Sequence, residues 1–158
     1  MRERWPDLSV LQLDAHADLR DEYRGTPHSH ACAMRRVREI CPVVQLGIRN
    51  LSAEEARWAR ENRIELGYGG VLRDSAVWDR LLGTLSKHVY VTIDLDGFDP
   101  SVCPGVGTPE PGGFSWEEGL RILRRVFAER EVVAADVVEL CPLPGQIRSD
   151  FLAAKLVY

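Results

Sequence analysis

The chain has 158 residues, of which 45% are hydrophobic and 28% are charged, and these values are typical of a soluble globular domain. No apolar run approaches the ~20 residues that span a bilayer, and the first ten residues lack the apolar core of a secretion signal, so we expect a cytoplasmic protein with no membrane partner. The net charge of −4 argues against nucleic acid as a partner, and the four cysteines, which form no C-x-x-C pair, are typical of reduced thiols.

In chain order, short apolar runs rich in Val, Ile and Leu alternate with amphipathic segments. Runs that are apolar on both faces are typical of buried parallel strands. The runs cover residues 8–13, 42–48, 89–95 and 132–140, with a further short candidate at 64–66. This alternation predicts an α/β domain in which helices cover a parallel sheet.

The segments between these runs have the periodicity of amphipathic helices. They cover residues 52–62, 75–85 and 115–127, and residues 151–158 read as the start of a final helix. The first and third open with the S-x-x-E spacing of a capping box, at Ser52 with Glu55 and at Ser115 with Glu118. In the third segment, the stripe predicted to face the core consists of Leu120, Leu123 and Phe127.

Three polar side chains follow the first apolar run at alternate positions, in the stretch LQLDAHADL: Asp14, His16 and Asp18. Burying an uncompensated carboxylate is costly, so two acids this close need a cation, a proton or open solvent. The simplest alternative to a binding site is a loop that exposes these acids to water. A lone D-x-H-x-D pattern does not distinguish the two.

A second acidic pair follows the run at 89–95. Asp94 and Asp96 are two residues apart, so on a strand both side chains point to one face. Ligands of parallel α/β sheets bind beyond the carboxyl ends of the strands, where these acids and the first motif would meet. Oxygen ligands with one imidazole and no thiolate favour manganese over structural zinc. Taken alone, Asp94 and Asp96 could instead be helix caps or solvated turn residues.

The chain resembles the ureohydrolases, the arginase and agmatinase family of manganese enzymes, in three motifs in the same order. They are LQLDAHADL (11–19), YVTIDLDGFDPSVCPGVGTPEPGG (90–113) and DVVELCP (136–142), and GTPEPGG (107–113) is closer to agmatinases than to arginases. The resemblance implies a three-layer α/β/α fold with a mainly parallel sheet and two Mn²⁺ ions per site. It also implies hydrolysis of a small cationic guanidinium substrate by a metal-bridging hydroxide, with agmatine giving putrescine and urea as the leading reaction. We also expect a homo-oligomer, because strands that the family places before residue 8 are missing and an unpaired sheet edge favours self-association.

The resemblance also implies a role for each matching metal ligand. Asp14 and Asp94 match ligands that bridge the two ions, His16 and Asp96 match ligands of one ion, and Asp18 matches a ligand of the other. Two divalent ions lower the pKa of a shared water, which would provide hydroxide near neutral pH.

Three residues match the catalytic and substrate-binding positions of the family. Asp18 corresponds to the carboxylate that steadies the hydroxide, His30 to a proton-shuttling histidine that also contacts substrate, and Glu139 to the acid that pairs with the guanidinium. A planar guanidinium suits a bidentate carboxylate, and a histidine can protonate the leaving amine.

The chain also departs from the family pattern. It contains no Gly-Gly-Asp-His motif, which in the family lies upstream of D-x-H-x-D and supplies a further metal ligand, and Ala31 and Cys32 stand where a Gly-Thr pair is usual. We therefore expect residues 1–158 to form a partial ureohydrolase domain that begins near the fourth strand and ends within the last helix. One metal position would keep all its ligands: Asp14, His16, Asp94 and Asp96.

Two functional classes follow from these features. The first is an agmatinase-like amidinohydrolase. The second is a catalytically impaired or non-catalytic fragment that retains one metal position. The number of metal ions bound per chain distinguishes the two.

Overall fold

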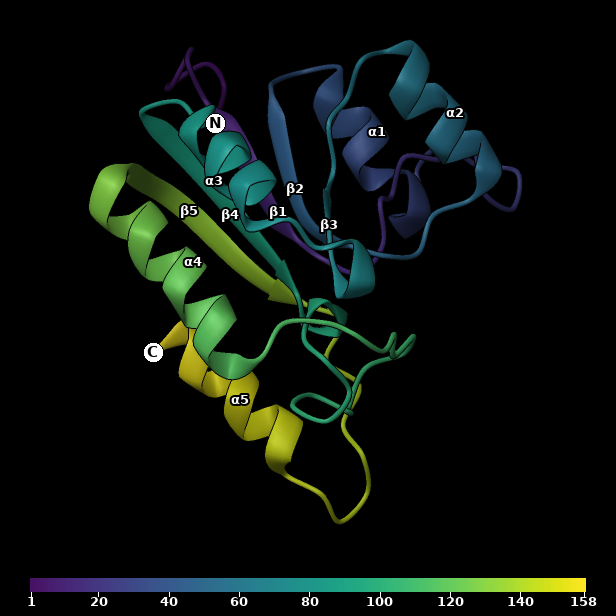
Figure 1. The fold of residues 1–158 in the computed structure, drawn as a ribbon, viewed down its shortest axis with the longest axis vertical. Helices are drawn as coiled ribbons and strands as arrows, with labels where there is room; N and C mark the ends of the chain where they lie inside the picture. Colours follow the sequence, from purple (N-terminus) through teal and green to yellow (C-terminus); the bar gives the residue numbers. More distant parts are fainter.

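The computed structural model describes residues 1–158, apart from the side chain of Val71. Five strands form one sheet in the order β3-β2-β1-β4-β5, and every neighbouring pair is parallel (Figure 1). The strands are β1 (Ser9–Leu13), β2 (Val43–Ile48), β3 (Gly67–Tyr68), β4 (His88–Asp94) and β5 (Glu131–Val138). The predicted α/β class with a parallel sheet is confirmed.

Helices cover both faces of the sheet, which gives three layers (Figure 1). On one face, α1 (Ala33–Arg38) and α2 (Ala53–Glu61) pack against β1 and β2. On the other face lie α3 (Ser75–Gly83), α4 (Trp116–Glu129) and α5 (Arg148–Val157). Short 3₁₀ turns are η1 (His30–Cys32), η2 (Gly70–Leu72) and η3 (Leu95–Gly97). None of the helices described is long and apolar enough to cross a bilayer.

The order of the strands determines where a ligand can bind. From β1 the chain builds outward to β2 and β3 with α1 and α2 on one face, and it then returns to build β4 and β5 on the other side of β1. Parallel crossovers are almost always right-handed, so the two directions place their helices on opposite faces. The connections after β1 and β4 therefore diverge, and a crevice opens between the carboxyl ends of these two strands.

The short run at 64–66 was predicted as a strand, and the structure corrects this. The third strand is Gly67–Tyr68, which pairs with β2. A Cβ at Gly67 would lie 2.4 Å from Leu46 Cδ2 and 3.0 Å from the Gln45 carbonyl oxygen, so this position leaves little room for a side chain. Leu66, just before the strand, is buried in the core instead.

The capping boxes predicted for α2 and α4 are both present, but the buried stripe of α4 differs from the prediction. The buried residues are Gly119, Ile122, Leu123 and Val126, whereas Phe127 is 57% exposed. A Cβ at Gly119 would lie 2.6 Å from the Phe98 ring. The missing side chain lets α4 pack on that ring, and this contact sets the rotation of the helix.

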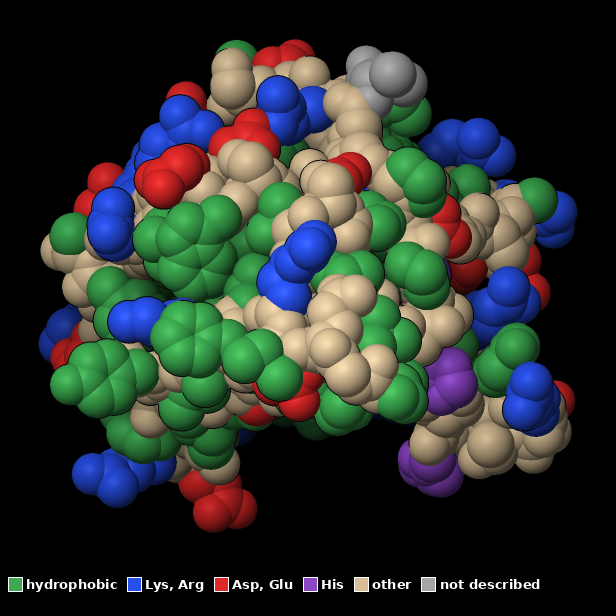
Figure 2. All heavy atoms as spheres, turned by 90° about the horizontal axis from the view of Figure 1, so that it is seen from below, with side chains coloured by type: hydrophobic (Ala, Val, Ile, Leu, Met, Phe, Trp, Pro, Cys, Tyr) green, Lys and Arg blue, Asp and Glu red, His purple; other side chains and the backbone are tan. Residues whose placement is uncertain are grey.

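Part of the sheet surface has little cover. On the face that α1 and α2 share, Tyr90 and Asp136 are only half-buried, and Val138 is 40% exposed. Within the described chain, β5 pairs only with β4, so it is an edge strand. Further large apolar side chains are exposed on α5 and the loop before it: Leu143, Ile147, Phe151 and Val157. The loop before α5 lies at the end of the molecule that Figure 2 views, and hydrophobic side chains gather on that face.

An open edge strand beside exposed apolar surface favours pairing between chains. We expect the isolated chain to sediment as a species larger than its 17.8 kDa monomer. A lysine on the edge strand should oppose pairing, so Ala134→Lys should shift the distribution toward monomer. The matched control is Ala128→Lys on the exposed side of α4, which should leave sedimentation unchanged. A monomeric wild-type chain at high concentration would contradict this expectation.

Candidate active site

A cavity of about 820 Å³ extends along one face of the sheet, from Met1, Arg2 and Leu8 to the residues at the carboxyl ends of β1, β4 and β5. Its lining includes residues that are far apart in the sequence, from Met1 to Glu139. All seven residues predicted from the sequence line it: Asp14, His16, Asp18, His30, Asp94, Asp96 and Glu139. Their chemical roles remain predictions.

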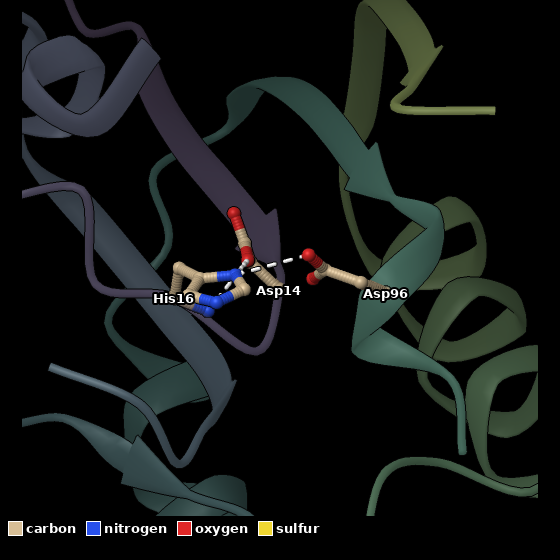
Figure 3. A group of neighbouring side chains, drawn as sticks. All are labelled: Asp14, His16 and Asp96. Carbon is tan, nitrogen blue, oxygen red and sulfur yellow. Dashed lines mark hydrogen bonds and ion pairs between the residues drawn. The ribbon is translucent and has the colours of Figure 1, made fainter. Parts of the chain in front are cut away.

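Three of these side chains meet at the ends of β1 and β4: Asp14, His16 and Asp96 (Figure 3). The His16 Nδ1 atom is 3.0 Å from Asp96 Oδ2 and 3.6 Å from Asp14 Oδ1. One potential ligand atom from each residue lies within 4.8 Å of those of the other two. Both carboxylates are buried, so this is an enclosed cluster of metal-capable atoms and not an exposed loop.

The turn after β4 aims Asp96 at this cluster. Asp94 Oδ1 accepts a hydrogen bond from the Asp96 backbone N–H at 3.0 Å and so stabilises the first turn of η3. Asp96 in turn accepts hydrogen bonds from the Ala15 N–H at 3.2 Å and from Thr108 Oγ1 at 3.0 Å. A Cβ at Gly97 would lie 3.0 Å from the Asp14 nitrogen, so the sequence D-x-D-G permits this close approach.

Burial and mutual repulsion strongly perturb the acids of the site. Burial is the largest cause that raises the pKa of Asp94 to about 9, with Asp14 and Asp96 adding to it. Burial likewise raises the pKa of Asp18 to about 8 and that of Asp14 to about 6. Such values mean that the folded chain disfavours the state in which all these acids are ionised together.

The histidine of the cluster partly compensates this charge. Its contacts with Asp14 and then Asp96 raise the pKa of His16 to about 10. Burial opposes ionisation of Asp96, but the contact with His16 outweighs it and lowers the pKa of that carboxyl. A proton on His16 therefore occupies the position in which a cation would interact with both carboxylates.

The backbone at two predicted site residues has unusual geometry. Asp18 has φ +54° and Glu139 has φ +63°, and both are among the few non-glycine residues in the left-handed region. Residues held in this region are uncommon and concentrate at functional sites. The turn at Glu139 brings its Oε2 to 4.0 Å from where a Cβ on Gly107 would be, so Glu139 faces the GTPEPGG loop across the cavity.

His30 begins η1 and is exposed on the cavity lining. Its ring makes an edge contact with Tyr23, with ring centroids 5.8 Å apart. Ser29 Oγ is 3.5 Å from His30 Nδ1. The imidazole thus lies on a different element from the acidic cluster and is open to solvent.

Arg49 binds backbone carbonyl groups around the site. Its Nη2 donates to the Asp96 carbonyl at 2.6 Å and to the Glu110 carbonyl at 2.7 Å. Its Nη1 donates to the Gly47 carbonyl at 3.0 Å. One side chain therefore connects the turn that carries Asp96 to the GTPEPGG loop and to β2, a role that sequence spacing alone does not reveal.

Asp136 also lines the cavity, and its carboxylate is hydrogen-bonded by neighbours on the sheet. Thr92 Oγ1 donates to it at 2.6 Å, and Tyr90 Oη donates to its other oxygen. The pairing of β4 with β5 explains the contact, because Thr92 lies opposite Asp136. Its oxygens are thus engaged within the sheet.

A family model described as the arginase family matches residues 1–158. The chain belongs to the arginase family. It is 44% identical over 154 residues to the N(1)-aminopropylagmatine ureohydrolase of Synechocystis sp., covering 96% of this chain and 50% of that protein. It is 38% identical over 148 residues to the agmatinase of Bacillus subtilis, covering 90% of this chain and 50% of that protein.

Solved structures give the same result. The agmatine ureohydrolase of Thermoplasma volcanium superposes with a TM-score of 0.80 at 31% identity, over 96% of this chain and 53% of that one. The arginase-like fold implied by the three sequence motifs is therefore confirmed. The chain spans about half the length of the curated relatives it matches.

The donor set of this arginase-family site suits a divalent cation. Asp14 and Asp96 supply oxygens and His16 supplies a nitrogen, with no thiolate among the residues of the cluster. Burial and the neighbouring carboxylates raise the pKa values of Asp94 and Asp18, so positive charge at this point would favour their ionised forms. A bound cation would provide that charge.

This electrostatic state predicts a pH dependence of stability. Asp18 and Asp94 have raised pKa values, so between about pH 4 and pH 8 to 9 the metal-free folded chain holds more protons than the unfolded chain. The same holds for His16 from about pH 6.5 to 10. The free energy of unfolding should therefore fall as pH rises through this window.

Binding of Mn²⁺ should remove this penalty, because ligation requires the deprotonated acids. We expect the melting temperature without metal to fall from about pH 6 to about pH 8.5, and the increase produced by Mn²⁺ to grow over the same range. Thermal unfolding followed by circular dichroism measures both. Asp94→Asn, which keeps the shape without the charge, should flatten the metal-free profile. A metal-free melting temperature that rises with pH would contradict this assignment.

Proposed function

We propose that residues 1–158 form a single unit of an arginase-family ureohydrolase domain that binds Mn²⁺ and a guanidinium group in the cavity at the ends of β1 and β4. The observation that supports this most is the convergence of buried acids, one imidazole and Glu139 on one cavity at the strand-order reversal. In this reading, Asp14, His16, Asp94 and Asp96 hold one ion. Asp18 contributes to a second.

The metal would supply Lewis acidity and lower the pKa of a water molecule at the site. The protein residues have other tasks. Asp96 is held by the Ala15 N–H and Thr108, so it does not need to reorganise on ligation. Arg49 keeps the turn that carries Asp96 against the GTPEPGG loop. Rigid ligands of this kind lower the entropic cost of binding.

Glu139 is suited to bind the guanidinium group. It follows β5 directly, its left-handed backbone presents it to the cavity, and its carboxylate faces Gly107. A guanidinium offers parallel N–H donors that match two carboxylate oxygens. His30, which also lines the cavity, would deliver a proton to the leaving amine and accept one from solvent.

The cationic substrate class has two leading members. Agmatine is the first, because GTPEPGG resembles the agmatinase pattern. N(1)-aminopropylagmatine is the second, because 44% identity to an N(1)-aminopropylagmatine ureohydrolase exceeds 38% identity to an agmatinase. Both molecules carry the same guanidinobutyl group, so the proposed chemistry at Glu139 is shared. Rates of urea release from each would establish the preference.

The metal assignment predicts the effect of removing one acid. Asp94→Ala should weaken Mn²⁺ binding by at least about tenfold, because even indirect contacts to a metal ligand are worth that much. The control is Asp79→Ala on α3, whose carboxylate is exposed on the surface and contacts Arg125. Calorimetric titration measures affinity and stoichiometry together. Affinity equal to wild type in Asp94→Ala would mean that Asp94 is not a ligand.

If Glu139 binds the guanidinium group, a change at this residue should impair urea release without weakening Mn²⁺ binding. In the Mn²⁺-loaded chain, Glu139→Gln should lower kcat/KM for urea release by roughly tenfold to a hundredfold, since a hydrogen bond to a charged group contributes about 1.5 to 3 kcal/mol. Mn²⁺ affinity should not change. Glu117→Gln, on the exposed side of α4, is the matched control.

The alternative, a non-catalytic fragment, predicts a different experimental result. If the chain binds about one Mn²⁺ and releases no urea from either substrate, it is a non-catalytic member that retains a metal position. Agmatine binding to the loaded chain then still tests Glu139, because Glu139→Gln should weaken that binding. Equal binding by both proteins would show that Glu139 is structural.

A further inference from the structure

A line of buried hydrogen bonds connects helix α1 to the metal-binding cluster. Arg38 donates to Gln45 Oε1 from Nε at 3.2 Å and from Nη2 at 2.9 Å. Gln45 Nε2 donates to Gln12 Oε1 at 2.6 Å, and Gln12 Nε2 donates to Asp14 Oδ2 at 2.6 Å. Both glutamines and the aspartate are at most 2% exposed.

The direction of this line is determined by its two ends. Arginine can only donate, and an ionised carboxylate can only accept. Gln45 must therefore present its oxygen to Arg38 and its nitrogen to Gln12, and Gln12 must present its nitrogen to Asp14. Reversing either amide would place two donors or two acceptors against each other at both of its contacts.

The positions of these glutamines are unusual for strand interiors. Gln12 and Gln45 lie directly opposite each other in the β1–β2 pairing, with apolar neighbours on either side in sequence. A buried amide costs free energy unless its hydrogen bonds are made. Gln45 also donates to the Ala17 carbonyl at 2.7 Å, within the loop that carries His16 and Asp18.

The position of Arg38 is also unusual. It is mostly buried, yet among the described residues no carboxylate lies within 4.0 Å of its guanidinium. Its contacts are the Val43 carbonyl at 3.0 Å and Gln45. A buried cation with no ion-pair partner is costly, and the carboxylate nearest along its hydrogen bonds is Asp14.

We propose that Arg38, Gln45 and Gln12 are positioning residues that hold the Asp14 carboxylate in one orientation, with Oδ2 accepting from Gln12 and Oδ1 directed toward His16. Asp14 Oδ1 also accepts from the His16 backbone N–H at 2.6 Å, so both oxygens are assigned. Hydrogen bonds in series strengthen one another, and a cation at the donor end adds to this effect. The inference rests on the proposed function only in taking Asp14 as a metal ligand.

The first arm of the test uses the metal-free chain. In Arg38→Met, the side-chain amide resonances of Gln12 should shift and exchange faster with solvent, although Arg38 does not touch Gln12. Arg36→Met on the same helix, which removes a surface contact with Asp21, is the matched control and should leave them in place. Unmoved Gln12 resonances in a folded Arg38→Met chain would overturn the relay.

The second arm measures Mn²⁺ affinity by titration. Arg38→Met should weaken it by about tenfold to a hundredfold, the range found for residues that orient a metal ligand. Arg38→Lys, which keeps a charged donor, should recover part of the loss and also serves if Arg38→Met fails to fold. Adding Gln12→Met to Arg38→Met should weaken Mn²⁺ binding little further, because both substitutions interrupt the same line of hydrogen bonds. Additive losses, or full affinity in Arg38→Met, would overturn the proposal.

The two arms separate this inference from the proposed function. If the wild-type chain binds no Mn²⁺, the metal centre is wrong, and the resonances of Gln12 alone decide whether Arg38 orients Asp14. If the wild-type chain binds Mn²⁺ and Arg38→Met binds it equally well, the metal centre stands and the relay is wrong.

Discussion

The buried acids at the ends of β1 and β4 impose the constraint on which the rest of this structure depends. Asp14, Asp94 and Asp96 lie in one crevice, where burial and mutual repulsion disfavour their charged forms. A fold can maintain such a cluster only if protons or a cation offset the charge and if the surrounding backbone is held rigidly. In the metal-free chain a protonated His16 offsets part of that charge. A bound cation would offset the rest.

Several features of the fold serve to hold these acids together. The reversal of strand order opens the crevice, and Gly97 lets the β4 turn approach the end of β1. Arg49 binds the backbone carbonyls of two loops, and Thr108 orients Asp96. The line from Arg38 does the same for Asp14 through the interior of the sheet. Each contact restricts a side chain or a turn at the strand ends by fixing it against a packed element.

The chain belongs to the arginase family, and this membership is the basis on which a hydrolytic function is proposed for the site. The chain spans about half the length of its curated relatives, and within that half all predicted site residues line one cavity. The half-exposed face of β4 and β5 and the unpaired edge of β5 adjoin the same cavity.

The sequence by itself determined the α/β class, four of the five strands, both capping boxes and the residues that converge on the cavity. These follow from local periodicity, capping chemistry and motifs, which depend on residues that are close together in the sequence. Only the tertiary structure decided the position of β3, the buried face of α4 and the roles of Arg49, Gln12 and Gln45. Each of these depends on a contact between distant elements: Gly67 against Leu46, Gly119 against Phe98, and Arg38 and Arg49 against atoms that the chain brings to them only on folding.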